Sequence, residues 1–240
     1  MGRAHEVRAA AMAKTAAAKS KLYSRYGKEL LIAAKAGVPD PEMNLGLKRK
    51  IAEAKANQVP ADVIKRAIEK AKGGTGENYD SCRYEGFGPG AATIIIDCLT
   101  DNTNRSVSAV KTCFNKAHCK MGVAGCVSHS YDNVGLFNFP YEDEEGMLDA
   151  LIMAEVNVID IECEDGTMTV TVDPTDFHKA KEAIDTLVPE VEYGACEITM
   201  LPQEYVKLES EEDKESWNRL LTMLDDCDDV QKVYHNVEAE

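Results

Sequence analysis

The sequence predicts an α+β protein built from an N-terminal three-helix bundle, a discontinuous α/β sheet domain and an inserted ferredoxin-like βαββαβ domain. Three observations lead to this fold class. Alanine-rich segments with helical apolar stripes fill the first third of the chain. A glycine-rich turn precedes the most β-prone run of the protein, and a later segment follows the order strand, helix, strand, strand, helix, strand. With 240 residues the chain can hold two or three cores, and we place the domains at 1–78, at 79–132 with 204–240, and at 133–203.

The first 73 residues are predicted to carry a helical bundle. Residues 4–19 are an arm of strong helix formers with little bulk to bury, which is expected to be helical or mobile, and residues 20–36 carry the apolar stripe of a first bundle helix. The Asp40-Pro41 pair is expected to start a second helix, and Pro60 a third one that ends at Gly73. Three short helices of this kind make a small bundle.

The stretch from Tyr84 to Arg105 is expected to organise the sheet domain. Its glycines and proline predict a tight turn over residues 86–90, and its β-branched run predicts a strand over 93–99. The polar cluster after this strand is good capping chemistry for a helix over 105–117.

The rest of the chain is predicted to alternate strands with helices. A strand over 127–131 closes a β-α-β unit, and a strand, a helix over 216–224 and a strand over 230–234 return to the same sheet after residue 204. Between these pieces lies the ferredoxin-like unit. Its strands are expected at 134–139, 158–163, 167–172 and 192–200, and its helices at 144–154 and 176–187.

Charge is divided unequally along the chain. The net charge is −15. Residues 1–73 hold 16 Lys and Arg against 7 Asp and Glu, a net charge of +9, which leaves 11 against 35, or −24, for the remainder. Such segregation favours a polyanion-binding face on the helical segment and a remainder that is repelled by polyanions. The alternative is a solvated basic helix surface with no ligand.

The candidate nucleic-acid contacts are the cations of this helical segment and one tyrosine. They are Lys14, Lys19, Lys21, Tyr23, Arg25, Lys48, Arg49, Lys50, Lys65 and Arg66. Guanidinium and ammonium groups bind phosphate without reading sequence, and no helix-turn-helix, zinc-finger or RNP pattern adds base-specific readout. Tyr23 could stack on an unpaired base or pack in the core. Asn102, Asn104 and Arg105 could contact RNA or protein, and helix capping with an internal ion pair explains them equally well.

Several other classes of site are not predicted. No nucleophile, base and orienting group share a recognisable motif, and neither phosphate-binding glycine fingerprint is present, so we expect no enzyme and no cofactor. His118, Cys119, Cys126 and His129 have no standard zinc spacing, the acidic runs have no EF-hand spacing, and no metal is expected. Eight cysteines without a C-x-x-C pair or a secretory signal indicate reduced thiols. The absence of a signal peptide or membrane-length apolar run predicts a cytoplasmic protein that does not enter the membrane.

Four motifs, in order along the chain, carry a family resemblance. They are Tyr84-Glu85-Gly86-Phe87-Gly88-Pro89, Asn102-x-Asn104-Arg105, Phe114-Asn115-Lys116, and the tail Asp225-Asp226-x-Asp228-Asp229-Val230-Gln231-Lys232-Val233-Tyr234-His235-Asn236. Together they resemble the YebC/PmpR family over essentially the whole chain. The Gly2-Arg3 start and Pro39-Asp40-Pro41-Glu42 are similar to the branch that includes the YeeN proteins.

The resemblance implies a three-domain cytoplasmic protein that regulates transcription by binding DNA. It also implies an alternative, a ribosome-associated translation factor that binds ribosomal RNA or tRNA and eases elongation through proline-rich stretches. Both activities require polyphosphate binding, and the sequence does not choose between them. A third hypothesis is a protein-interaction module whose acidic lobes dock a basic partner.

The chain departs from the family pattern at three places. Where the family usually has Lys-Trp-Ala-Asn-Ile, this chain has Ala4-His5-Glu6-Val7-Arg8, so a tryptophan able to stack on a base is missing. The usual Gly-Gly-Asn return is His118-Cys119-Lys120, and the usual Gly-Ser-Val-x-Tyr is Gly125-Cys126-Val127-Ser128-His129. The effect of these changes, like the oligomeric state, is not encoded in any pattern of the sequence.

Overall fold

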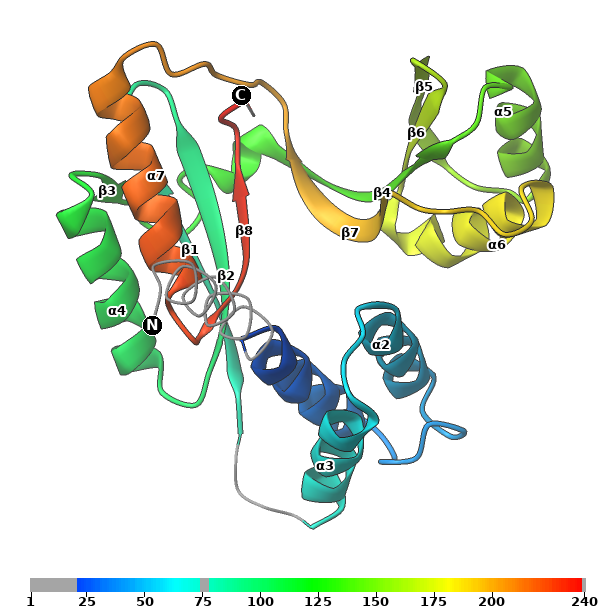
Figure 1. Cartoon of the computed structure of the whole chain (residues 1–240), viewed down its shortest axis with the longest axis horizontal. Helices are drawn as coiled ribbons and strands as arrows, with labels where there is room; N and C mark the ends of the chain where they lie inside the picture. Colours follow the sequence, from blue (N-terminus) through cyan, green and yellow to red (C-terminus); the bar gives the residue numbers. More distant parts are fainter. Residues whose placement is uncertain (1–20, 74–77, 239–240) are drawn as a thin grey trace, which may run out of the picture. The chain divides into compact units, whose positions relative to one another are not determined.

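The computed structural model describes residues 21–73 and 78–238 (Figure 1). Within this range the chain forms two compact units, each described by itself below. The first unit holds residues 21–73, 78–84, 96–122 and 210–233, and the second holds residues 85–95, 123–209 and 234–238. The residue boundaries of the three domains stay a prediction.

The first unit begins with the predicted three-helix bundle, which is confirmed. Its helices cover residues 21–35, α2 (Leu45–Ala56) and α3 (Ala61–Lys72). Apolar side chains recur at helical spacing, so each helix turns one stripe inward. The buried core of the bundle consists of Tyr26, Leu30, Ala34, Leu47, Ala54, Val59, Ile64 and Ala67.

The start predicted for the second helix is wrong. Asp40 accepts a hydrogen bond from the backbone N–H of Glu42 in a preceding turn, and α2 begins only after Asn44. The Asn44 side chain accepts from the N–H of Leu47 at 3.0 Å and donates to the carbonyl of Ala33 at 2.8 Å. Asn44 therefore caps α2 and also ties it to the end of the preceding helix, which an aspartate without N–H donors could not do.

A four-stranded sheet follows, with strand order β3-β1-β2-β8. Its strands are β1 (Asp80–Phe87), β2 (Thr93–Thr100), β3 (Lys120–Met121) and β8 (Val230–His235), and its helices are α4 (Thr103–Lys116) and α7 (Glu211–Asp225). Figure 1 shows α4 and α7 side by side, and the two helices are in contact. Strand β8 returns from the C-terminal end of the chain to lie beside β2.

Three local predictions in this region are wrong. Gly86 and Phe87 of the predicted turn belong to strand β1, and the turn is confined to the residues around Gly90, where the N–H of Gly88 donates to the carbonyl of Ala92 at 2.8 Å. Strand β1 was missed because its end at Gly86 and Phe87 runs into the glycines and proline that were interpreted as a turn, although Cys82 and Tyr84 alternate with polar residues. The expected strand at 127–131 is instead a short 3-10 turn (Ser128–Ser130), and the strand expected after residue 204 is a single bridge between Val206 and Val237.

The inserted ferredoxin-like unit is confirmed in the second unit of the chain. Its sheet has the order β5-β6-β4-β7, which is the ferredoxin-like arrangement of four strands. The elements are β4 (Tyr131–Pro140), α5 (Glu144–Met153), β5 (Val158–Glu164), β6 (Thr167–Val172), α6 (Phe177–Leu187) and β7 (Ala195–Pro202). Gly135 on β4 is required by packing, because a Cβ there would lie 2.9 Å from side-chain atoms of Phe177 and Val172.

Two further properties of the described residues bear on function. None of their helices has the length and apolar character needed to cross a lipid bilayer. None of the eight cysteines forms a disulfide bond, and Cys98 and Cys113 are buried.

Candidate nucleic-acid interface

A groove runs between the helix of residues 21–35 and α3 of the bundle. It has a volume of about 330 Å³ and lies wholly within the first unit. Its lining includes Tyr23, Ser24, Gly27, Lys28 and Leu31 from the first helix, Val63, Arg66, Ala67 and Lys70 from α3, and Tyr79. The structure thus brings together two residues predicted separately from the sequence, Tyr23 and Arg66.

The groove combines aromatic rings with cations. Lys28 lies over the ring of Tyr79, with its Nζ 5.6 Å from the ring centroid. Arg66 pairs with Asp62 one turn earlier on α3, and both side chains are largely exposed, at 69% and 74%. An ion pair that is so well hydrated contributes little stability, so the Arg66 guanidinium can exchange Asp62 for another anion.

Helices α2 and α3 carry five exposed cations besides those that line the groove. We call this set the basic face, and its members are Lys48, Arg49, Lys55, Lys65 and Lys72. Lys48 lies 3.3 Å from Glu42, and both of these side chains are exposed. Among residues 21–73 and 78–238, the other four members of the basic face have no ion-pair partner. Their charge is therefore open to solvent and to an external anion.

Two of the predicted cations are instead held by carboxylates of the protein. Lys50 lies 2.9 Å from Glu29 and 2.7 Å from Glu53. Burial lowers the pKa of Lys50, but its hydrogen bonds to Glu53 and Glu29 outweigh burial, so the pKa is raised. Lys21 donates to the Asp226 carboxylate at 2.9 Å, and this hydrogen bond is the main reason that its pKa is raised.

Of the three remaining predicted cations, one lies within the described residues. Arg25 is half-buried on the first helix, two residues from Tyr23. Lys14 and Lys19 lie outside the described residues.

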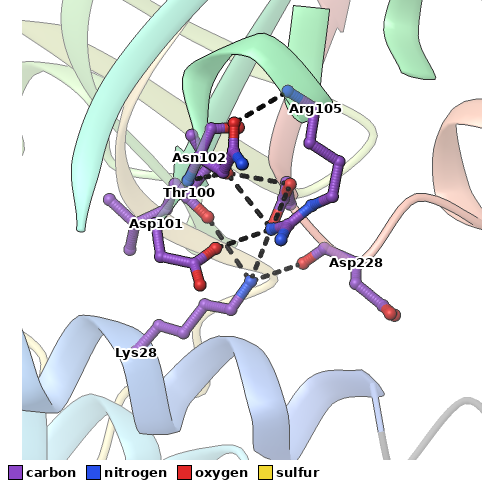
Figure 2. Close-up of polar contacts among 8 residues, drawn as sticks. Lys28, Thr100, Asp101, Asn102, Arg105 and Asp228 are labelled. Atoms are coloured by element: carbon purple, nitrogen blue, oxygen red, sulfur yellow. Dashed lines mark hydrogen bonds and ion pairs between the residues drawn. The ribbon is translucent and has the colours of Figure 1, made fainter. Parts of the chain in front are cut away.

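Asn102 and Arg105 belong to a polar cluster at the end of β2, shown in Figure 2. The Asn102 side chain accepts from the N–H of Arg105 at 3.0 Å and so caps α4. The Arg105 guanidinium donates to Asp101 at 2.7 Å and to Asp229 at 3.1 Å. Asn104 is exposed on the first turn of α4. The structure thus contains the helix cap and the internal ion pair that the sequence analysis gave as one explanation of this motif. The other explanation, contact with RNA or protein, stays a prediction.

Asp229 is the centre of this cluster, which we call the Asp229 cluster. Its carboxylate accepts from Thr100 Oγ1 at 2.9 Å, from Arg105 and from Lys28 Nζ at 3.3 Å. Lys28 also donates to the backbone carbonyls of Asp228 at 2.9 Å and Leu99 at 3.4 Å. The cluster therefore joins the first bundle helix to the end of β2 and to the loop before β8, as the dashed contacts around Lys28 in Figure 2 show.

Sequence reasoning missed the role of Asp229 and of a second carboxylate, Glu85. Glu85 is 3% exposed and accepts three backbone hydrogen bonds in the second unit, from Gly125 at 2.9 Å, Val127 at 2.8 Å and Ser128 at 3.0 Å. Burial raises the pKa of Glu85, but these N–H donors outweigh it, and the pKa lies below the usual value of 4.5. The only signal in the sequence was that both residues lie within the quoted family motifs.

The groups considered for zinc do not form a site of their own. His118 and Cys119 belong to the first unit, whereas Cys126 and His129 belong to the second. In the described part of the chain, no three His, Cys, Asp or Glu side chains are placed to hold one metal ion. The thiol of Cys119 donates instead to the backbone carbonyl of Ala117.

The chain is similar to known proteins over its whole length. Residues 3–74 match the family model for the TACO1/YebC protein N-terminal domain, and residues 79–237 match that for the TACO1/YebC second and third domain. A "Probable transcriptional regulatory protein" of Vibrio vulnificus is 52% identical over 238 residues, which are 99% of this chain and 100% of the relative. A relative of the same name from Vibrio cholerae is 51% identical over 240 residues, with full coverage of both chains.

A solved structure agrees with these matches. The crystal structure of a conserved hypothetical protein from Aquifex aeolicus superposes with a TM-score of 0.75 at 32% identity, covering 91% of this chain and 90% of the other. The resemblance noted in the sequence motifs is confirmed, and the chain belongs to the TACO1/YebC family.

Proposed function

We propose that the protein is a regulator of gene expression that binds nucleic acid through the basic face and the adjoining groove of its helical bundle. The observation that carries this proposal is the open charge of the basic face, whose members Arg49, Lys55, Lys65 and Lys72 have no ion-pair partner among the described residues. Cations of this kind bind phosphates, supply affinity and leave sequence unread. Relatives named as probable transcriptional regulatory proteins support DNA as the ligand and transcription as the process.

The proposal predicts a loss of binding when the basic face is reversed in charge. The triple variant Lys48→Glu, Arg49→Glu, Lys65→Glu should bind duplex DNA at least about tenfold more weakly at moderate salt. The slope of log affinity against log salt should also fall by roughly three, because about one counterion is released per phosphate contact. Fluorescence anisotropy with a labelled duplex at several salt concentrations measures both quantities.

A matched control separates the site from the net charge. The triple variant Lys111→Glu, Lys116→Glu, Lys120→Glu changes the total charge by the same amount at exposed positions on α4 and β3. It should retain most of the affinity and most of the salt slope. Equal losses in the two triple variants would contradict the assignment of the site, and salt-independent binding in the wild type would contradict phosphate contact.

Translation is the second candidate process, and the aromatic lining of the groove favours it. Tyr23 and Tyr79 line the groove beside cations, a combination typical of proteins that bind unpaired nucleotides. Ribosomal RNA and tRNA offer such nucleotides. Ribosome profiling of a deletion strain, compared with its transcript levels, separates the two processes. Pauses at proline-coding tracts with unchanged messages indicate translation, whereas altered messages without pauses indicate transcription.

A further inference from the structure

We propose that the groove between the helix of residues 21–35 and α3 is a binding site for an unpaired base, so that the protein prefers single-stranded to double-stranded nucleic acid. This inference rests on the proposed function, because it names the form of nucleic acid that the bundle takes. The proposed ligand is a nucleotide whose base is unpaired, and such nucleotides occur in both RNA and DNA.

The aromatic side chains are the first reason. Tyr23 is half-buried, since it packs against the bundle core and also lines the groove. A ring held in this way is a preformed platform that loses little side-chain freedom when a base stacks on it. Tyr79 supplies a second ring to the same groove. Stacking tolerates any base, which fits the lack of a base-reading motif in the sequence.

The glycine in the middle of the first helix is the second reason. Gly27 lies within the helical segment 21–35 and lines the groove. A Cβ at this position would meet only Val63 Cγ1, at an ordinary 3.8 Å, so packing within the bundle does not require glycine. Glycine lowers helix stability relative to alanine. Because glycine has no side chain, position 27 leaves space in the groove that a larger residue would occupy.

The cations are the third reason. Arg66 and Lys70 lie one turn apart on α3 and both line the groove, so the phosphate of a stacked nucleotide can be bound beside its base. Lys28 is already engaged by Asp229 and two backbone carbonyls, so it orders the groove but is not needed as a phosphate ligand. At about 330 Å³ the groove can take one nucleotide. In a duplex each base is stacked and paired and must be extruded before it can enter such a site.

The first test compares single strands with a duplex. Fluorescence anisotropy is measured at one salt concentration with oligo-uridine, oligo-thymidine and a mixed duplex, each of about 12 nucleotides or base pairs, within the usual range of site sizes. The wild type should bind a single strand about tenfold more tightly than the duplex, the lower part of the range for one stacked base. Equal affinities for single strand and duplex would overturn the proposal.

Variants of Tyr23 identify the platform. Tyr23→Leu retains an apolar side chain against the bundle core and should lose about tenfold in single-strand affinity with little change for the duplex. Tyr23→Phe retains the ring and should bind like the wild type. Tyr205→Leu, at an exposed tyrosine of the second unit, should also bind like the wild type. An equal loss for duplex and single strand in Tyr23→Leu would contradict base stacking.

Gly27 provides a test that removes neither a ring nor a charge. Gly27→Leu places a side chain into the groove and should abolish the preference for single strands. Gly27→Ala should raise the midpoint of thermal unfolding of the bundle, because alanine is the better helix former. Circular dichroism tests whether both variants are folded. A Gly27→Leu protein that is folded and retains full preference for single strands would overturn the site.

These outcomes are distinguishable from failure of the proposed function. A wild type that binds none of the probes contradicts nucleic-acid binding as such. Salt-dependent binding that requires the basic face but ignores Tyr23 and Gly27 leaves the proposed function standing and overturns the groove. A Tyr23→Leu loss confined to oligo-uridine assigns the site to RNA, and one confined to oligo-thymidine assigns it to DNA.

Discussion

Replacing Glu85 by alanine is expected to lower the free energy of unfolding of the second unit by about 3 kcal/mol, because three backbone N–H groups lose their acceptor. The donors belong to Gly125, Val127 and Ser128, about 40 residues away along the chain. A nearly fully buried carboxylate leaves no space for water to replace all three bonds. Urea unfolding followed by circular dichroism measures the loss.

A conservative variant and an exposed control make this prediction sharper. Glu85→Gln retains an acceptor oxygen but loses the charge, so it should destabilise less than Glu85→Ala. Glu204→Ala, at an exposed glutamate of the same unit, should change stability by less than about 0.5 kcal/mol. If Glu85→Ala were as neutral as Glu204→Ala, the three hydrogen bonds would have no energetic role.

The charge of Glu85 also predicts a pH dependence. The pKa of Glu85 is lower in the folded protein than its ordinary value of 4.5. The folded state therefore favours the ionised form, and this contribution to stability is fully present above the unfolded pKa and is lost as the pH falls through the folded pKa. The stability difference between wild type and Glu85→Gln should shrink as urea unfolding is repeated at pH values below 4.5. A difference that grows toward acid would contradict this sign.

Replacing Asp229 by alanine is expected to lower the free energy of unfolding of the first unit by about 2 to 3 kcal/mol. The Asp229 side chain is 13% exposed and that of Lys28 is 14% exposed, so the variant leaves a poorly hydrated ammonium group without its counter-charge. Thr100 and Arg105 lose an acceptor at the same time. Fluorescence of Trp217, the single tryptophan of the chain, reports unfolding in this unit.

The neighbouring aspartate is a matched control. Asp228 contributes its backbone carbonyl to Lys28, and this bond survives removal of the side chain. Asp228→Ala should therefore change stability by less than about 0.5 kcal/mol although it removes the same charge from the same acidic run. Asp101→Ala, which removes a half-exposed partner of Arg105, should cost less than about 1 kcal/mol. Equal losses at positions 228 and 229 would mean that net charge, and not the Asp229 cluster, sets the effect.

The sequence pattern was sufficient to predict those helices and strands whose own residues carry a helical or strand period. The strands and helices of the ferredoxin-like unit are apolar segments separated by turn and capping residues, and each predicted range overlaps the observed element. Strand β1 carries only a short alternating signal, which the glycine-rich turn after it obscures, and it is paired with neighbouring strands in the sheet. The true cap of α2 was missed for a related reason, since Asn44 is fixed by a carbonyl of the preceding helix.

The candidate site was only partly predictable. Composition indicated the basic segment, and residue type marked Tyr23 and Arg66 as candidate contacts, both of which line the groove. Neither could indicate that Lys50 is engaged by Glu29 and Glu53 while Lys65 is open, because ion pairing depends on which helix faces meet. Gly27 has no signal in the sequence beyond being a glycine in a helix, and its proposed role depends on the groove above it.

The sequence by itself determined the order of most helices and strands, the segregation of charge and the family motifs, because each of these is a property of neighbouring residues. The tertiary structure alone decided which carboxylates neutralise which cations, which backbone groups Glu85 and Asp229 satisfy, and which side chains meet in the groove. The physical reason is the sequence separation over which each kind of interaction acts. Periodicity and capping act within a few residues, whereas the bonds of Asp229 to Thr100 and Lys28 join positions more than 100 residues apart and exist only after the chain has folded.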